Sequence, residues 1–90
     1  MGKPKRKPEK RSAIEIQEWL ISWLSKELDI EAIQIDVKEE FVNLGVSSRQ
    51  AVILTGELED WLGLTLEPSL AWEYPSIQTL SEYLTDLTTQ

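Results

Sequence analysis

The chain has 90 residues, 41% of them hydrophobic, and a formal net charge of −7, so we expect one small domain that buries a modest core. It contains no cysteine and no histidine, which excludes disulfides, thiolate nucleophiles, Cys/His zinc sites and histidine general bases together and argues against an enzyme. No apolar run approaches the ~18 residues that a membrane-spanning helix needs, and the basic N-terminus lacks the apolar segment of a secretory signal, so we expect a cytoplasmic protein.

Charge is divided unevenly along the sequence. Six of the nine basic residues lie in the first eleven positions, whereas from Ala13 onward three basic side chains stand against fifteen acidic ones, a net charge of −12. Residues 1–11 are too charged and too poor in apolar side chains to fold, so we predict a flexible basic tail. Such a tail can anchor a protein to nucleic acid or membrane. It can also be a solvated tether or a remnant of a larger assembly, which we favour. The acidic domain, residues 12–88, is expected to bind basic partners and no nucleic acid.

The first predicted helix begins at Ser12 and ends near Leu28. Ser12 and Glu15 have the S-x-x-E spacing of a capping box. Apolar side chains then recur on one helical face: Ile16, Leu20, Trp23 and Leu24. Trp19 and Trp23 have the spacing of a ligand-stacking pair, but tryptophans at helical spacing more often belong to a core or to its edge, which we favour.

A long connection, residues 29–46, follows this helix. Its apolar residues alternate in part with polar ones, as in a strand: Ile30, Ile33, Ile35 and Val37. A lone strand is not stable, and no second strand is available to pair with it. We therefore predict a packed loop with a short helical turn over residues 38–42, and we expect Phe41 and Leu44 to enter the core.

The second main helix is predicted from about Ser48 to Leu62, and Gly63 suits the left-handed residue that ends a helix. One of its faces is apolar: Ala51, Leu54, Leu58, Trp61 and Leu62. The other carries Arg49, Ile53, Gly56, Glu57 and Asp60. Gly56 costs ~1 kcal/mol relative to Ala, and either a close approach by a partner backbone or simple tolerance explains it. Ile53 is apolar on a charged face, which predicts a docking contact.

One short and one long helix complete the predicted fold. Residues 69–73 are predicted to form one helical turn that brings Leu70 and Trp72 inward. Pro75 disfavours helix at Tyr74, and Ser76 is a good N-cap for the final helix. The apolar stripe of that helix is Ile77, Leu80, Tyr83, Leu84 and Leu87. None of these helices is long enough to be stable alone, so we expect an all-α fold, a small bundle of three main helices plus one short helix.

The start of the second main helix, at Ser47 and Ser48, is the stretch best suited to an anion. The first backbone N–H groups of a helix have no internal partner, and the macrodipole places partial positive charge there. A hydroxyl at this point can therefore carry a phosphodiester at low electrostatic cost. Serine is also a preferred N-cap, which is the purely structural alternative.

Three stretches together resemble an acyl carrier protein of the polyketide-synthase type. Residues 41–45, FVNLG, resemble the F-x-x-L-G run that precedes the carrier serine of that family. Ser48 with Ala51, Val52 and Leu54 resembles its D-S-L-x-A-V-x-L block. Residues 70–84 resemble its L-x-x-x-Y-P-T-I-x-x-L-x-x-Y-L ending, so the resemblance covers about residues 12–87.

The attachment motif departs from the family pattern at three positions. Ser47 stands where the family has Asp, Arg49 where it usually has Leu, and Ile53 where Glu is common. By charge alone, these changes predict slow modification by a generic transferase, or a dedicated partner that offers an acidic group to Arg49.

The resemblance implies a covalent 4'-phosphopantetheine arm on Ser48, with Ser47 as the alternative; Gly45, three residues before Ser48, favours Ser48. It implies a phosphopantetheinyl transferase that uses coenzyme A and magnesium, and acyl-loading and acyl-processing enzymes with basic docking surfaces. Such a carrier holds acyl intermediates as thioesters for fatty-acid or polyketide-type synthesis, and we expect it to act as a monomer. The docking residues we predict are Arg49, Ile53, Glu57, Glu59 and Asp60.

Two other binding functions stay open. A carrier-like fold that is never modified and serves as an acidic interaction module is consistent with the variant sequence Ser47-Ser48-Arg49. A peptidyl carrier of a peptide synthetase is the nearest related function, although such carriers tend to have a second glycine before the serine, where this chain has Val46.

Catalysis by adjacent carboxylates is a third alternative, which we disfavour. Glu39-Glu40 and Glu59-Asp60 have the spacing of neighbouring acid/base groups. Neighbouring carboxylates on an acidic surface are usually only solvated, and no nucleophile accompanies these pairs.

Overall fold

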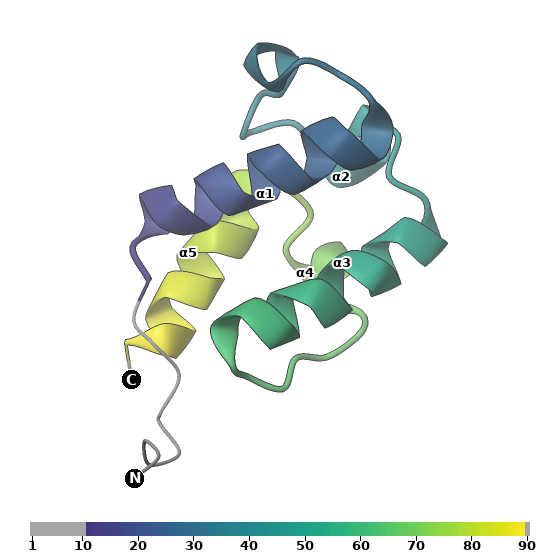
Figure 1. Ribbon diagram of the computed structural model, residues 1–90. Helices are drawn as coiled ribbons and strands as arrows, with labels where there is room; N and C mark the ends of the chain where they lie inside the picture. Colours follow the sequence, from purple (N-terminus) through teal and green to yellow (C-terminus); the bar gives the residue numbers. More distant parts are fainter. Residues whose placement is uncertain (1–10, 90) are drawn as a thin grey trace, which may run out of the picture.

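The computed structural model describes residues 11–89, so the predicted tail lies outside the described residues except for Arg11. Three long helices dominate this part of the chain: α1 (Ala13–Leu28), α3 (Ser48–Leu62) and α5 (Ile77–Thr88) (Figure 1). Shorter elements join them: the 3-10 helix η1 (Ala32–Gln34) and the one-turn helices α2 (Phe41–Leu44) and α4 (Leu70–Glu73). The predicted all-α bundle is confirmed, with α2 as a second short helix. None of the helices in residues 11–89 has the length and apolar character to cross a membrane.

Each long helix begins after a serine that caps it. Ser12, Ser47 and Ser76 each accept a hydrogen bond from the backbone N–H three residues later, and the side chain of that later residue accepts from the N–H of the serine. These capping boxes satisfy donors that the start of a helix leaves without partners. The predicted starts of α1 and α5 are therefore confirmed, and Ser47 is the residue that caps α3.

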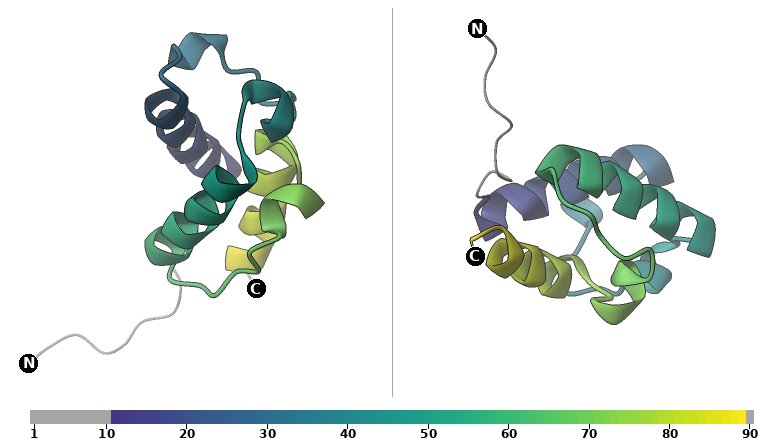
Figure 2. Two further views of the ribbon diagram at one scale, coloured as in Figure 1. Left: turned by 90° about the vertical axis from the view of Figure 1, so that its right-hand side faces the viewer. Right: turned by 90° about the horizontal axis from the view of Figure 1, so that it is seen from below.

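Helices α1 and α5 pack against each other in opposite directions, and α3 lies across the core from them (Figures 1 and 2). Because of this arrangement, the start of α1 and the end of α5 lie at one end of the molecule, while α3 begins at the opposite end. Ser48, the first residue of α3, is therefore far from both ends of the described chain.

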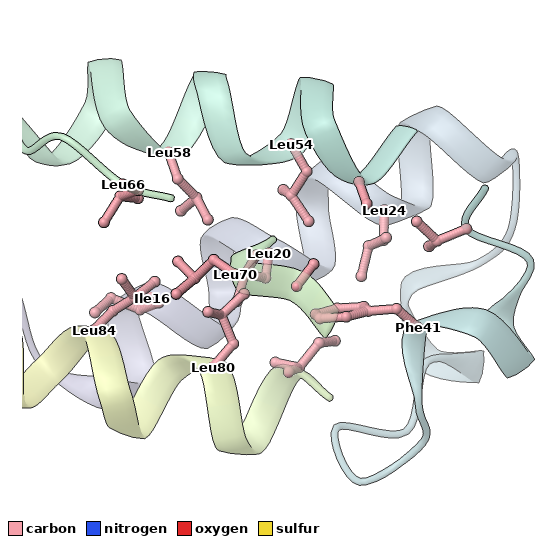
Figure 3. Close-up of a cluster of buried hydrophobic side chains, with 14 of the residues drawn as sticks. Ile16, Leu20, Leu24, Phe41, Leu54, Leu58, Leu66, Leu70, Leu80 and Leu84 are labelled. Atoms are coloured by element: carbon pink, nitrogen blue, oxygen red, sulfur yellow. The ribbon is translucent and has the colours of Figure 1, made fainter. Parts of the chain in front are cut away.

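The core is one cluster of aliphatic side chains and Phe41, enclosed by the three long helices (Figure 3). Each long helix contributes the buried stripe that its periodicity predicts: Ile16, Leu20 and Leu24 from α1; Ala51, Leu54, Leu58 and Leu62 from α3; Ile77, Leu80 and Leu84 from α5. Burying one large aliphatic side chain contributes about 1.5–3 kcal/mol, so this cluster is the main source of stability.

The segment that leads to α3 is fastened to the segment that precedes α5. Two backbone hydrogen bonds join them, one from the Phe41 N–H to the Pro75 carbonyl at 2.7 Å and one from the Gln78 N–H to the Val37 carbonyl at 2.9 Å. Between these bonds, Glu40 and Ser76 form an isolated antiparallel bridge. We call this pairing of residues 37–41 with residues 75–78 the clasp. Together with the buried Phe41 ring, it fixes the approach to α3.

Two local predictions were wrong. Trp72 is 44% exposed, whereas Leu70 and Ala71 are buried. Residues two apart in a helical turn point to nearly opposite sides, so Leu70 and Trp72 cannot both face the core. The turn predicted over residues 38–42 instead occupies Phe41–Leu44, because Glu40 is extended where it pairs with Ser76 and the helix ends at Gly45, whose φ of 102° terminates a helix.

Candidate functional site

The two adjacent serines at the start of α3 have different environments. The Ser47 Oγ accepts the Gln50 N–H at 3.1 Å, and the Ser47 N–H donates to the Gln50 Oε1 at 2.9 Å. Ser48 is the first residue of the helix and is exposed, and its hydroxyl makes no hydrogen bond within residues 11–89. The Ser47 hydroxyl therefore caps the helix, while the Ser48 hydroxyl is accessible for chemical modification.

The first turn of α3 fits a phosphate group. The N–H groups of Ser48 and Arg49 have no acceptor within the described part of the chain, as is usual for the first positions of a helix. No acidic side chain lies in this turn, so the partial positive charge of the helix start is not compensated there. A phosphate ester on the Ser48 Oγ would meet two open donors, the helix dipole and the neighbouring guanidinium.

Arg49 is an isolated positive charge in an otherwise acidic part of the chain. It is the only basic residue after Lys38 in the sequence. Its side chain is exposed and has no ion-pair partner among residues 11–89. The positive charge of Arg49 is therefore available to a group that is brought to this end of α3.

Four of the predicted docking residues share the outer face of α3. Arg49, Ile53, Glu57 and Asp60 follow one another at helical spacing and are exposed, with Ile53 at 42%. Glu57 also contacts α1, because its Oε1 accepts the indole N–H of Trp23 at 3.0 Å.

The fifth predicted docking residue, Glu59, has a different environment. It is half-buried, and its Oε2 accepts the backbone N–H of Leu66 at 2.6 Å. Leu66 itself is buried in the core. Glu59 therefore stabilises the loop that follows α3, in addition to any contact with a partner.

Exposed apolar residues near the start of α3 were missed in the sequence. Val52 is 52% exposed and lies one turn after Ser48, and Val42 is exposed in α2. The spacing of four residues between Ser48 and Val52 was the available signal, since such residues are neighbours on a helix surface. With Ile53, Val52 makes the surface of α3 near Ser48 apolar as well as charged.

Trp19 and Trp23 do not form a pair with each other. Trp19 stacks on Trp61 of α3. Both tryptophans of α1 border a cleft of about 370 Å³ between α1 and α3, which Ser22, Lys26, Glu27 and Glu57 also line. Binding sites for organic molecules are lined mostly by apolar side chains, and the charged lining of this cleft is unlike them. The tryptophans therefore serve mainly to join the two helices at the edge of the core, which agrees with the prediction of a core or core-edge role.

The fold of residues 11–89 is that of the carrier proteins. The fold is similar to that of an acyl carrier protein from Anabaena sp. PCC 7120 with a variant phosphopantetheinylation-site sequence, with a TM-score of 0.81 and 38% identity over 97% of this chain and 99% of that one. It is also similar to a free-standing peptidyl carrier protein from Acinetobacter baumannii, with a TM-score of 0.80 and 34% identity over 84% of this chain and 95% of that one.

Sequence comparison gives the family. The family model described as the phosphopantetheine attachment site matches residues 18–84, so the chain belongs to this family of carrier proteins, which hold 4'-phosphopantetheine covalently. A phenolphthiocerol/phthiocerol polyketide synthase from Mycobacterium tuberculosis is 40% identical over 70 residues, which are 78% of this chain and only 4% of that much longer protein. The predicted resemblance to polyketide-synthase carriers and the predicted cofactor are both confirmed.

Proposed function

We propose that Ser48 carries the phosphopantetheine arm and that the protein holds acyl intermediates as thioesters for polyketide-type or fatty-acid synthesis. It does so as a cytoplasmic monomer that catalyses no reaction itself. The observation that carries the choice of Ser48 is the contrast between the two serines: the Ser47 hydroxyl caps α3, and the Ser48 hydroxyl is exposed and has no hydrogen bond among the described residues.

Attachment is a substitution at phosphorus. The Ser48 Oγ attacks the phosphorus that bears the pantetheine of coenzyme A, an O–P bond forms, the pyrophosphate bond breaks, and adenosine bisphosphate leaves. The hydroxyl proton passes to a base of the transferase, and magnesium offsets the charge of the phosphates. When bound, the arm supplies a terminal thiol that holds an acyl group as a thioester. Because Ser48 lies at the exposed end of α3, a transferase reaches its hydroxyl without unfolding the bundle.

The outer face of α3 is the docking surface that we propose for the transferase and for acyl-loading and acyl-processing enzymes. Ile53 supplies an apolar contact, while Glu57 and Asp60 attract basic surfaces, with a smaller part for Glu59 because its carboxylate already binds the loop after α3. Arg49 lies at the end of this face next to the serine. Attraction between exposed charges is screened by salt, so docking at this surface weakens as ionic strength rises.

Intact-mass measurement tests the attachment site. Wild type, Ser48→Ala and Ser47→Asn are each incubated with coenzyme A, magnesium and a broad-specificity transferase. Asn is as good an N-cap as Ser, so the Ser47→Asn variant removes the hydroxyl and keeps the helix start. We expect a phosphopantetheine adduct on wild type and Ser47→Asn and none on Ser48→Ala. An adduct on Ser48→Ala that is lost in Ser47→Asn assigns attachment to Ser47 instead, and a folded wild type that several transferases leave unmodified favours the acidic interaction module.

A peptidyl carrier is the second candidate, because the chain is 34% identical to a free-standing peptidyl carrier protein of nearly the same fold. The arm would then hold an aminoacyl group in place of an acyl group. Offering the modified protein to acyl-activating ligases and to amino-acid-activating enzymes separates these cargoes. A mass increase that corresponds to an amino acid, with none for an acyl chain, supports the peptidyl carrier.

A further inference from the structure

The distribution of charge suggests that Arg49 acts on the arm itself. Fifteen acidic side chains follow Ala13, but between Glu39 and Gln90 Arg49 is the single basic one. It forms no ion pair with any of them within residues 11–89, although its long side chain is exposed and free to reach a partner. This cation therefore lies directly beside the hydroxyl proposed for attachment and is not neutralised by the described part of the domain.

We propose that Arg49 binds the phosphodiester of the arm and thereby makes the modified protein more stable than the unmodified one. This inference rests on attachment at Ser48. The phosphorus is then bonded to the Ser48 Oγ, at the start of the first turn of α3, so the guanidinium of the next residue can fold over it. Residues i and i+1 do not face each other within a helix, but a group attached at the first residue extends past its end, where this restriction is weaker.

Three donor groups surround the phosphate: the N–H of Ser48, the N–H of Arg49 and the guanidinium of Arg49. The N–H groups of Ser48 and Arg49 lack acceptors among the described residues, and the helix start carries partial positive charge. A guanidinium adds a charge-assisted hydrogen bond that its planar fork can make bidentate. Because no acidic side chain competes in this turn, the phosphodiester supplies the only negative charge there. The root of the arm is thereby held against the start of α3.

Thermal melting of matched unmodified and modified samples tests this inference. Wild type, Arg49→Gln, Arg49→Lys and Lys26→Gln are prepared in both forms, and each modified sample is verified by mass. Lys26→Gln is the control, since it also removes one exposed basic side chain, but from the last turn of α1. The quantity compared is the difference in Tm between the modified and unmodified forms of one variant, so general effects of the substitution on folding cancel.

We expect modification to raise the Tm of wild type by about 2–5 °C at low salt, because the phosphodiester gains both the helix start and a charge-assisted hydrogen bond from Arg49 in a domain of this length. The same rise is expected for Lys26→Gln, less than half of it for Arg49→Gln, and an intermediate rise for Arg49→Lys, which keeps the charge and loses the fork. About 1 M salt reduces the rise in wild type. The ³¹P resonance of the modified protein is expected to shift on Arg49→Gln and to stay in place on Lys26→Gln.

If modification raises the Tm of wild type and Arg49→Gln equally and the ³¹P resonance is unchanged, the inference is overturned. The proposed function still stands in that case, because the adduct has formed. Slower modification of Arg49→Gln with an unchanged Tm difference assigns Arg49 to an acidic group of the transferase and also overturns it. Absence of any adduct on wild type overturns the proposed function and this inference together.

Discussion

The indole rings of Trp19 in α1 and Trp61 in α3 stack with their centroids 5.1 Å apart and their planes 12° from parallel. The guanidinium of Arg11 also lies over the Trp61 ring, 4.6 Å from its centroid. These side-chain contacts therefore join α3, which begins with Ser48, to α1, which packs along α5. Stacked aromatic pairs contribute beyond the area they bury, so this contact is worth measuring by itself.

A double-mutant cycle at this pair is expected to show coupling. Trp19→Leu, Trp61→Leu and the double variant retain apolar bulk but lose the stacked rings. Because stacking adds about 0.5–1.5 kcal/mol, the double variant should be less destabilised than the sum of the two single variants by that amount, as measured by urea unfolding. Trp72→Leu is the control, since Trp72 is exposed and makes no ring contact in residues 11–89, and it should change stability by less than ~0.5 kcal/mol. Additive single effects would contradict a contribution from stacking.

The serines at the start of α3 should differ in their effect on stability. Ser47→Ala removes the N-cap and is expected to lower the free energy of unfolding of the unmodified protein by about 1 kcal/mol. Ser48→Ala removes an exposed hydroxyl without a partner and should change it by less than ~0.5 kcal/mol. Chemical denaturation of the two variants makes the comparison, and an equal loss in both would show that the Ser48 hydroxyl is also used in the fold.

Two glycines should respond in opposite ways to replacement by alanine. A Cβ at Gly56 would meet no atom within 4 Å, so Gly56→Ala is expected to stabilise α3 by about 1 kcal/mol, raising the Tm by about 4–8 °C. Gly45 also has open space around it, but its φ of 102° is strained for alanine, so Gly45→Ala is expected to destabilise the protein.

Gly56→Ala also separates the two explanations of this glycine. A stabilised variant that a transferase modifies at the wild-type rate supports simple tolerance. A stabilised variant with a clearly reduced rate indicates that a partner backbone approaches α3 at Gly56.

Ile53 should affect docking more than folding. Because Ile53 is partly exposed, Ile53→Ser is expected to change the free energy of unfolding by about 0.5 kcal/mol or less. As a contact in the proposed interface, its loss should lower the kcat/KM of the transferase about tenfold, which corresponds to ~1.4 kcal/mol. Ile14→Ser, which changes an exposed isoleucine of α1, serves as the control. Similar rates for both variants would remove Ile53 from the docking surface.

The three long helices could be predicted from the sequence because their signals are local. For α3, the serines at its start, the helical period of its leucines and Gly63 at its end lie within one continuous stretch, and the observed bounds match the prediction. The buried stripes follow from the same period. Ser81 is an exception, because a serine predicts exposure, yet Ser81 is fully buried in α5 and accepts a hydrogen bond from the Gln17 side chain of α1.

The remaining features depend on contacts between distant segments. Ile33 is 91% exposed while Ile35 is buried, although both belong to the same alternating pattern. Which of them enters the core depends on how the connection passes over α1, and no local signal gives that path. Trp72 was misplaced for the same reason, since packing decides which side of a one-turn helix faces inward.

At the site, the sequence predicted two adjacent serines but could not separate their roles. Both are preferred at a helix start, and only the hydrogen bonds to Gln50 distinguish the cap from the open hydroxyl. The position of Glu59 against Leu66 was equally hidden, because a hydrogen bond to a loop depends on where that loop returns.

The antiparallel packing of α1 and α5 also determines how this domain can be connected to other proteins. The first and last described residues lie at the same end of the bundle, and α3 begins at the other (Figure 1). Neighbouring domains joined to both ends would therefore leave from a single pole, so that neither connection passes the serine. The bundle would then separate the proposed arm from the segments that connect the domain to its neighbours. The end at which α3 begins would stay accessible to one partner enzyme after another.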